Sequence, residues 1–491
     1  MKKISEATTK TYGHYPEKIL QFGEGNFLRG FADWMIDNAN ENGDYEGSIV
    51  ICQPVELGLT DLINSQNGIY TLVMRGIEDG SPVEIVKKIT SISRSFNPYE
   101  DYESLMALGR STDLEVVISN TTEAGIVYQS GNKLSDAPPS SFPAKVTALL
   151  YERYKAFKGD PTKGILFLPV ELIDKNGDQL KKIILQYATE WELEPDFITW
   201  IHQANKFTNT LVDRIVTGYP KDNIDYFEDK LGYKDDLLVT SELFNLWVIE
   251  GEKDWKSILP IHNNSAHVLW TTDATPYKTR KVRILNGAHT STVLAAYLSG
   301  HETVLDLIKD PTFDDFLEKL ISKEIIPTIE LPVNELESFA FAVKDRFSNP
   351  YIHHKLLDIS LNSCSKFNAR CLPTLLDYNR ITGELAEGLC FAFAAFIKFY
   401  QGSSTSGSYI GTRSDGTNYP IRDSEDVLAF FETVWSLKDM DTLANVVLSH
   451  KDFWSGKDLT EVPGLASKIA YYLNKLNTTT IKDILREMNL V

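Results

Sequence analysis

A short apolar strand followed by a glycine-rich turn constrains the fold of this chain more than any other stretch. Residues 18–22, Lys-Ile-Leu-Gln-Phe, read as a buried strand, and the turn Gly-Glu-Gly-Asn-Phe-Leu-Arg-Gly (residues 23–30) follows at once. Residues 31–39 then carry the apolar spacing of an amphipathic helix. In such a strand–turn–helix unit, backbone amides meet the pyrophosphate of a dinucleotide. Leu28 replaces the third glycine of the general Gly-x-Gly-x-x-Gly pattern, so the turn alone is also compatible with an ordinary loop.

Further strands are predicted in the first half. Apolar runs predict strands over residues 48–52 and 114–119 and at the start of residues 164–177, where a polar turn follows, and residues 84–92 alternate like a strand. A dinucleotide-binding fold has an acidic residue after the second strand, where it accepts hydrogen bonds from the adenosine ribose. Gln53 stands there, and Glu56 comes three positions later. The residues therefore leave the choice between NAD and NADP open, although no arginine is present there for a 2′-phosphate.

Small polar residues follow the strand expected over 114–119. They are Asn120, Thr121, Thr122 and Glu123. At the end of a parallel strand such residues lie at the carboxyl edge of the sheet, where cofactors bind. Ordinary turn chemistry explains the same residues equally well.

A basic stretch near the middle of the chain carries the best candidates for catalysis, Lys281, Asn286 and His289. On a helix of ~100° per residue, their five- and eight-residue steps fall within an arc of roughly 140°. A lysine that exchanges a proton, an amide that donates to a carbonyl oxygen and an imidazole that orients either one suit the reduction of a ketone. The alternative is a solvated, basic helix start, which the neighbouring Arg280 and Arg283 fit.

The second half of the chain has three- to four-residue apolar spacing and predicts an all-helical domain. We place the boundary near residue 270, with a Rossmann-type α/β domain over 1–270 and a helical domain over 271–491. Residues 240–250 alternate like an edge strand just before it. The Gly-, Ser- and Thr-rich residues 401–420 predict a loop that is either functional or disordered. The expected helices span residues 288–298, 313–324, 335–345, 352–361, 383–400, 424–437 and 464–473.

Composition excludes several classes of function. The chain has 491 residues and a net charge of −19, which argues against nucleic acid or an anionic membrane as a partner. Residues 1–10 lack the apolar core of a signal peptide, and the most apolar run, 389–399, is too short to cross a bilayer. Four cysteines without a Cys-x-x-Cys pair read as reduced thiols of a cytoplasmic protein. The histidines and cysteines show no zinc-ligand spacing, so we expect no metal.

Five motifs together resemble those of one enzyme family over essentially the whole chain. They are Gly-x-Gly-x-Phe-x-Arg (23–29), Asn-Thr-Thr-Glu-Ala-Gly (120–125), Val-Asp-Arg-Ile (212–215), Lys-x4-Asn-x2-His (281–289) and Arg-Phe-x-Asn-Pro (346–350). The family is that of mannitol dehydrogenase, the long-chain polyol-specific dehydrogenases. The resemblance implies an NAD-dependent oxidoreductase that transfers a hydride without a metal ion.

The resemblance also implies roles for particular residues. Lys281 would be the general acid/base, Asn286 would help to form the oxyanion hole, and His289 would position Lys281 or a substrate hydroxyl. The dinucleotide would bind, as NAD, at Phe22, Gly23, Gly25, Asn26, Phe27, Arg29, Gln53, Asn120, Thr121, Thr122 and Glu123.

Residues expected near the substrate are Glu171, Asp213, Arg346, His354, Lys366 and Arg370. Leu172 stands where the polyol branch of the family has an asparagine that supplies a second oxyanion donor. For Glu171 a proton relay and a plain helix cap remain open, and the Asp213–Arg214 pair is otherwise read as a surface ion pair.

Scattered basic residues on helices are usually solvated, but cations close to Lys281 would suit a small ketoacid derived from a hexuronate. A polyol-type substrate and a non-catalytic NADH-binding sensor are the alternatives. The oligomeric state, monomer or small homo-oligomer, is left open.

Overall fold

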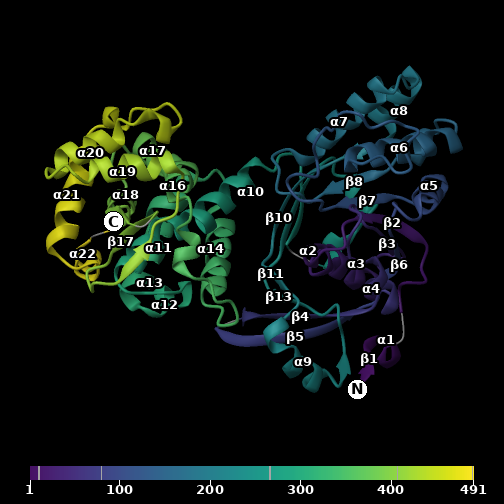
Figure 1. The fold of residues 1–491 in the computed structure, drawn as a ribbon, viewed down its shortest axis with the longest axis horizontal. Helices are drawn as coiled ribbons and strands as arrows, with labels where there is room; N and C mark the ends of the chain where they lie inside the picture. Colours follow the sequence, from purple (N-terminus) through teal and green to yellow (C-terminus); the bar gives the residue numbers. More distant parts are fainter. Residues whose placement is uncertain (9–10, 79, 265–266, 406, 489, 491) are drawn as a thin grey trace. The chain divides into compact units, whose positions relative to one another are not determined.

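The computed structural model describes residues 1–8, 11–78, 80–264, 267–405, 407–488 and 490. The chain forms two units (Figure 1). The first comprises Met1–Arg75 with Val83–Ala274, and the second comprises Gly76–Pro82 with Thr275–Val491. The first therefore ends at Ala274, close to the boundary that the sequence places near residue 270. Each unit is described by itself.

The first unit is built on a parallel sheet of six strands in the order β6-β3-β2-β7-β8-β9. Numbered along the chain, this is the 3-2-1-4-5-6 order of a dinucleotide-binding domain. The order reverses between β2 and β7, which opens a crevice at their carboxyl ends. The strands are β2 (Glu17–Phe22), β3 (Ser48–Cys52), β6 (Ile92–Phe96), β7 (Val116–Ser119), β8 (Leu166–Pro169) and β9 (Lys206–Phe207).

Both faces of this sheet are covered, which explains its nearly continuous apolar strands. Along β2, Ile19 packs into a core shared with the helix α3 (Ala32–Glu41), whereas Leu20 and Phe22 pack into the core on the other face. The helices around the sheet are α2 (Asn26–Arg29), α3 (Ala32–Glu41), α4 (Thr60–Ser65), α5 (Tyr102–Arg110), α6 (Phe142–Ala156), α7 (Asn176–Glu190) and α8 (Pro195–Ala204).

The prediction of one edge strand over residues 240–250 is wrong, because these residues take part in two smaller sheets. This segment forms two strands, β13 (Val239–Glu242) and β14 (Leu246–Glu250), and each lies in the middle of a different sheet. The non-strand residues 243–245 separate them. Similarly, residues 84–92 contain the end of β5 and the start of β6 rather than one strand. The remaining members are β4 (Tyr70–Glu78), β5 (Ser81–Ile89), β10 (Asn209–Asp213), β11 (Val216–Gly218) and β15 (Val268–Thr271).

The second unit is largely helical, as predicted. Its central helix, α18 (Glu387–Phe399), is buried along almost its whole length and packs against α11 (Ala288–Leu298) and α21 (Leu465–Thr478). The other helices are α10 (Thr275–Arg280), the π-helix η5 (Lys281–Gly287), α11 (Ala288–Leu298), α12 (Val304–Lys309), α13 (Pro311–Lys319), the π-helix η6 (Leu320–Ile325), α14 (Val333–Phe347), α15 (Leu356–Ile359), α16 (Ser363–Arg370), α17 (Leu372–Thr382), α19 (Glu425–Val434), α20 (Met440–Leu448), α21 (Leu465–Thr478) and α22 (Ile481–Glu487).

Residues 401–420 are expected from the sequence to form a loop, either functional or disordered, but their described residues form an antiparallel sheet instead of a loop. Its strands are β16 (Gly402–Thr405), β17 (Ser408–Thr412) and β18 (Asn418–Pro420). Two tyrosines fasten it to the end of α18: Tyr409 Oη donates to the Tyr400 carbonyl at 3.0 Å, and Tyr419 Oη donates to the Phe399 carbonyl at 2.8 Å. Gly411 leaves room for the Tyr419 ring, which a Cβ there would strike.

None of the helices in the described ranges is long and apolar enough to cross a membrane. All four cysteines are free and buried.

Candidate active site

The glycine turn of the first unit lies at the switch point of the parallel sheet. Gly23 has φ +122°, and a Cβ there would lie 2.9 Å from the carbonyl oxygen of Asn120 at the end of the neighbouring strand β7. Only glycine accepts both this backbone conformation and this approach. A Cβ on Gly25, by contrast, would meet nothing within 4 Å. The turn thus combines a close backbone crossing with open space, which fits a pyrophosphate lying against it.

Arg29 stabilises the turn from beneath. Its side chain is buried, and the guanidinium donates to the carbonyl oxygens of Glu24 and Leu237 and to Asn26 Oδ1. Burial lowers the pKa of Arg29, and Tyr70 and Asp33 partly offset this effect. The arginine of the Gly-x-Gly-x-Phe-x-Arg motif therefore shapes the turn through its own hydrogen bonds.

Three other residues expected at the cofactor pack within the first unit. Phe22 is buried against Phe142, and Phe27 stacks on Phe31 at 5.0 Å. Gln53 is also buried, and its amide is fully engaged: it accepts from Thr60 and donates to the carbonyls of residues 55 and 56. Gln53 thus organises the loop after β3.

Glu171 anchors the polar loop after β7. Its carboxylate accepts hydrogen bonds from Thr121 N and Oγ1, both at 2.9 Å, and from Ser119 Oγ at 3.0 Å. Burial raises the pKa of Glu171, although these hydrogen bonds act in the opposite direction. Thr122, with φ +70°, and Glu123 are exposed beyond this anchor. The structure therefore places Glu171 as a support for residues 120–123, and Leu172 beside it is 67% exposed.

The Asp213–Arg214 pair is not the surface ion pair of the alternative interpretation, because both residues are buried. Asp213 ends β10. The Arg214 guanidinium donates to the carbonyl of Gly30 at 2.6 Å and to that of Glu242 at 2.9 and 3.1 Å. Arg214 therefore ties the strand end to the segment that follows the glycine turn.

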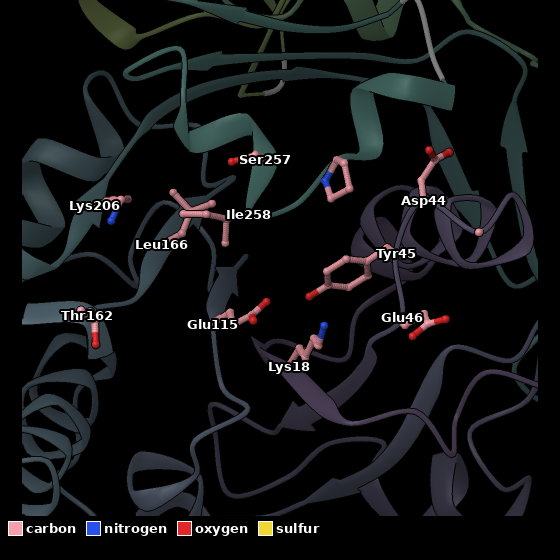
Figure 2. Close-up of a pocket in the computed structure, with 13 residues that line it drawn as sticks. Lys18, Asp44, Tyr45, Glu46, Glu115, Thr162, Leu166, Lys206, Ser257 and Ile258 are labelled. Carbon is pink, nitrogen blue, oxygen red and sulfur yellow. The ribbon is translucent and has the colours of Figure 1, made fainter.

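Figure 2 shows a cavity of about 600 Å³ at the opposite edge of the parallel sheet. Lys18 and Glu115 line it near the starts of β2 and β7, and Leu166 and Lys206 line it where β8 and β9 begin. Dinucleotides bind at the carboxyl ends of such strands. We therefore assign this cavity no part in cofactor binding.

In the second unit, Lys281 and Asn286 lie on a π-helix, not on the regular α-helix assumed from the sequence. Residues 281–287 form η5 between α10 and α11. The hydrogen bonds of a π-helix join residues five apart, so the side chains of Lys281 and Asn286 lie nearly one above the other. The roughly 140° arc expected of an α-helix is thus narrowed for this pair. Both side chains are half-buried.

His289 lies in the first turn of α11, against an aromatic ring and several cations. Its imidazole stacks on Phe347 with the ring centroids 4.0 Å apart and meets His354 edge-on at 5.3 Å. The pKa of His289 lies well below its ordinary value, because the ring is buried and because His354, Arg346, Arg370 and Lys366 repel a proton on it. His289 is therefore neutral at pH 7. Its Nε2 has no hydrogen-bond partner within the described part of the chain.

The cations expected near the substrate do gather around His289. Burial and mutual repulsion lower the pKa of Lys366 and of His354, and burial lowers that of Arg370. Lys366 Nζ donates to the Ile359 carbonyl at 2.8 Å, whereas the Arg370 guanidinium makes one long contact, 3.5 Å to Thr290 Oγ1. Neither residue forms a salt bridge to any residue that the structure describes.

The resulting charge pattern favours an anionic ligand. Half-buried cations without carboxylate partners are costly unless an anion binds beside them. Phe347, which stacks on His289, is a contact that the sequence analysis missed. Its place after Arg346 in the Arg-Phe-x-Asn-Pro motif is the signal that could have found it. No group of three or more His, Cys, Asp or Glu side chains suited to a metal ion occurs among the described residues.

Comparison with known families agrees with this arrangement. Residues 17–262 match the Rossmann domain of mannitol dehydrogenase, and residues 273–477 match the mannitol dehydrogenase C-terminal domain. The chain belongs to the mannitol dehydrogenase family, as its motifs predict.

Its sequence is similar to proteins named altronate oxidoreductase. The protein from Bacillus subtilis (strain 168) is 44% identical over 490 residues, which cover 99% of this chain and 98% of that one. The protein from Shigella flexneri is 44% identical over 480 residues, covering 96% and 97%.

Two solved structures share the fold over nearly the whole chain. One is D-sorbitol dehydrogenase in substrate-free form, with a TM-score of 0.79, 20% identity and coverage of 97% of this chain and 96% of that one. The other is mannitol 2-dehydrogenase of Pseudomonas fluorescens, in a ternary complex with NAD and D-mannitol, with a TM-score of 0.65, 22% identity and the same coverage.

Proposed function

We propose that this protein is an NAD-dependent oxidoreductase that interconverts D-tagaturonate and D-altronate in hexuronate catabolism. Relatives named altronate oxidoreductase are 44% identical over nearly the full length of both chains, which supports this substrate pair. The free, buried cysteines support a cytoplasmic location for the reaction.

The observation that carries the proposal is the state of Arg370. This arginine is half-buried, its pKa is lowered by burial, and it has no salt bridge in the part of the chain that the structure describes. Lys366, one helical turn earlier on α16, also forms no salt bridge with a described residue, although the nearby Asp423 carboxylate raises its pKa and partly offsets the effects of burial and of Arg370. A guanidinium binds a carboxylate in a bidentate manner, and Lys366 already donates to a carbonyl. We therefore assign the substrate carboxylate to Arg370 first, with Arg346 and His354 on the neighbouring elements.

Reduction of the ketone requires a hydride and a proton. The glycine turn and the loop of residues 120–123 would hold NADH, and the hydride for the ketone carbon would come from it and leave NAD. The carbonyl oxygen becomes an alkoxide, to which the Asn286 amide donates a hydrogen bond. Lys281 transfers an ammonium proton to this oxygen and thereby gives the alcohol. Oxidation of D-altronate reverses both transfers.

In this scheme His289 orients a neighbouring group and does not exchange a proton. Since its pKa is well below neutrality, the imidazole stays uncharged and adds no positive charge to the cluster. Its Nε2 is buried and has no hydrogen-bond partner among the described residues, and we assign this atom to Lys281 or to a substrate hydroxyl. Stacking on Phe347 fixes the orientation of the ring.

The residues of the first unit fit a dinucleotide. Gly23 permits the close crossing beside Asn120, Gly25 leaves open space, and Glu171 holds the loop of residues 120–123 at the same edge of the sheet. We propose NAD rather than NADP, because the loop after β3 offers Gln53 and Glu56 and no arginine for a 2′-phosphate.

The second candidate is another reductase of the same family, acting on D-fructuronate or on a neutral ketose of the mannitol type. A sensor that binds NADH without catalysis is the third. Lys366 and Arg370, which form no salt bridge with a described residue, speak against a neutral substrate, and so does Leu172 at the place of the polyol branch's asparagine. They do not distinguish the two ketoacids.

A substrate panel tests the proposal. Purified protein and NADH are mixed with D-tagaturonate, D-fructuronate or D-fructose, and the nicotinamide absorbance is followed. We expect the largest kcat/KM with D-tagaturonate. A larger value with either other ketone would favour the second candidate, and NADH binding without oxidation on all three would favour the sensor.

A further inference from the structure

A second cavity, of about 520 Å³, lies in the helical unit and has an unusual lining. Lys398, Arg413 and Lys482 line it together with three consecutive threonines, Thr478, Thr479 and Thr480. None of the described residues that line it is an aspartate or a glutamate. In a chain with a net charge of −19, a basic cavity without a lining carboxylate is a specific arrangement. Its volume is in the range of small-molecule sites.

The three cations differ in how far their charges are compensated. Arg413 pairs with Glu302 at 2.7 Å and with Asp415 at 3.4 Å, and Lys482 pairs with Asp310 at 2.5 Å. Lys398 Nζ donates only to the amide oxygen of Asn477, at 2.7 Å, and forms no salt bridge with any described residue. Burial lowers the pKa of Lys398, so a bound anion would relieve an existing cost.

We infer that this cavity is a regulatory site for a phosphate-bearing small molecule or for inorganic phosphate. A phosphate group presents several strong acceptor oxygens, and the ammonium of Lys398 with the threonine hydroxyls supplies donors of the matching kind. A carboxylate-lined cavity would repel the same group. Nothing in the proposed reaction uses these residues.

The cavity is joined to the active-site cations by two structural connections. Helix α11 runs from its first turn, which holds His289, to Leu298 at the cavity. In addition, Arg413 pairs with Glu302, whose carbonyl accepts a hydrogen bond from Leu356 N at 2.9 Å, and Val304 N donates to the His354 carbonyl at 3.0 Å. An anion that shifts Arg413 or Glu302 therefore acts on the segment that carries His354, and we expect it to change the KM of the substrate. This regulatory effect rests on the proposed function, but the binding does not.

Calorimetry on the full-length protein tests the binding without any substrate. The probes are inorganic phosphate, fructose 6-phosphate and fructose. We expect both phosphates to bind and fructose not to bind. If fructose 6-phosphate binds more tightly than inorganic phosphate, the natural ligand is a phosphorylated metabolite, and the reverse order identifies free phosphate.

Three charge-removing variants locate the site. Lys398→Met keeps most of the side-chain length and should weaken phosphate binding at least about tenfold, as loss of a charge-assisted hydrogen bond does. Lys482→Met, on α22, gives a second test if Lys398→Met fails to fold. Lys457→Met, at an exposed lysine outside the cavity, is the matched control and should bind like the wild type. Arg370→Met should also retain binding, which excludes the active-site cations as the phosphate site.

The outcomes separate the two parts of the inference. In the wild type, saturating phosphate should change the KM for D-tagaturonate at least threefold, and in Lys398→Met it should have no effect. The site would be overturned if the wild type did not bind phosphate, or if Lys398→Met and Lys482→Met both bound phosphate as tightly as the wild type does. Binding with an unchanged KM would overturn the regulatory role. Absence of any turnover in a protein that binds phosphate would instead count against the proposed reaction.

Discussion

Replacement of Arg370 by methionine should remove most of the preference for a carboxylate-bearing substrate. The arginine is half-buried on α16, burial lowers its pKa, and its single described side-chain hydrogen bond is the 3.5 Å contact with Thr290. Because the substitution removes only this one long hydrogen bond within the described part of the protein, the variant should fold normally. The lost charge-assisted bond to the substrate is worth about 1.5–3 kcal/mol, which corresponds to a decrease of roughly 10- to 150-fold in kcat/KM.

The assay compares two substrates and two variants. kcat/KM is measured for D-tagaturonate and for the neutral ketohexose D-fructose, with NADH saturating. Arg370→Met should lower the first value by the factor given above and change the second by less than about threefold. Arg380→Met is the control, because Arg380 is exposed and pairs with Asp377 on the same helix. Equal losses on both substrates, or no loss on D-tagaturonate, would refute the assignment of Arg370 to the carboxylate.

Three further predictions concern the oxyanion, the cofactor and pH. Asn286→Ala should lower kcat about 10²- to 10³-fold with little change in NADH affinity, as removal of an oxyanion donor does; an unchanged kcat would exclude this role. Gly25→Val should weaken NADH binding at least tenfold without changing the unfolding midpoint, because its Cβ enters open space, and unaltered NADH affinity in a fluorescence titration would contradict it. The depressed pKa of His289 means that below pH 6.5 the unfolded chain binds a proton that the folded chain does not. The free energy of unfolding should therefore fall by up to about 1.4 kcal/mol per pH unit below 6.5 on account of this group, and urea titrations should give a shallower pH dependence for His289→Gln; an identical slope would show that His289 is not the cause.

Nearly continuous apolar runs predict much of this fold, because the central sheet is covered on both faces. Residues 18–22 and 48–52 give nearly continuous apolar runs, and the buried residues 389–397 give a helix that is apolar all round. The sequence does not reveal that residues 240–250 divide between two sheets. Both parts, residues 240–242 and residues 246–248, are buried by neighbours that are distant in the sequence, so the local pattern does not separate them. Likewise, the small polar residues 401–420 suggest a loop, whereas two tyrosines dock them as a sheet.

The candidate site shows the same division between local pattern and tertiary context. The spacing of Lys281, Asn286 and His289 identifies these residues as candidates. It does not predict the π-helix that brings the first two side chains onto one face. No local pattern shows that the side chains of Arg29 and Gln53 form hydrogen bonds within the protein. Their partners lie in the loops and strands packed around them. Nor does sequence spacing reveal that His289 is kept neutral, since the cations responsible come from α14, the segment before α15, and α16.

The most direct test of the account compares wild-type protein with Lys281→Ala for NADH oxidation by D-tagaturonate, with the NADH dissociation constant measured on the same samples. Proton transfer by a positioned side chain contributes about 10²- to 10⁴-fold, so the variant should lose that factor in kcat while its NADH affinity stays within about twofold. A wild-type protein that binds NADH but leaves it unoxidised, or a variant that turns over at the wild-type rate, would contradict the central claim.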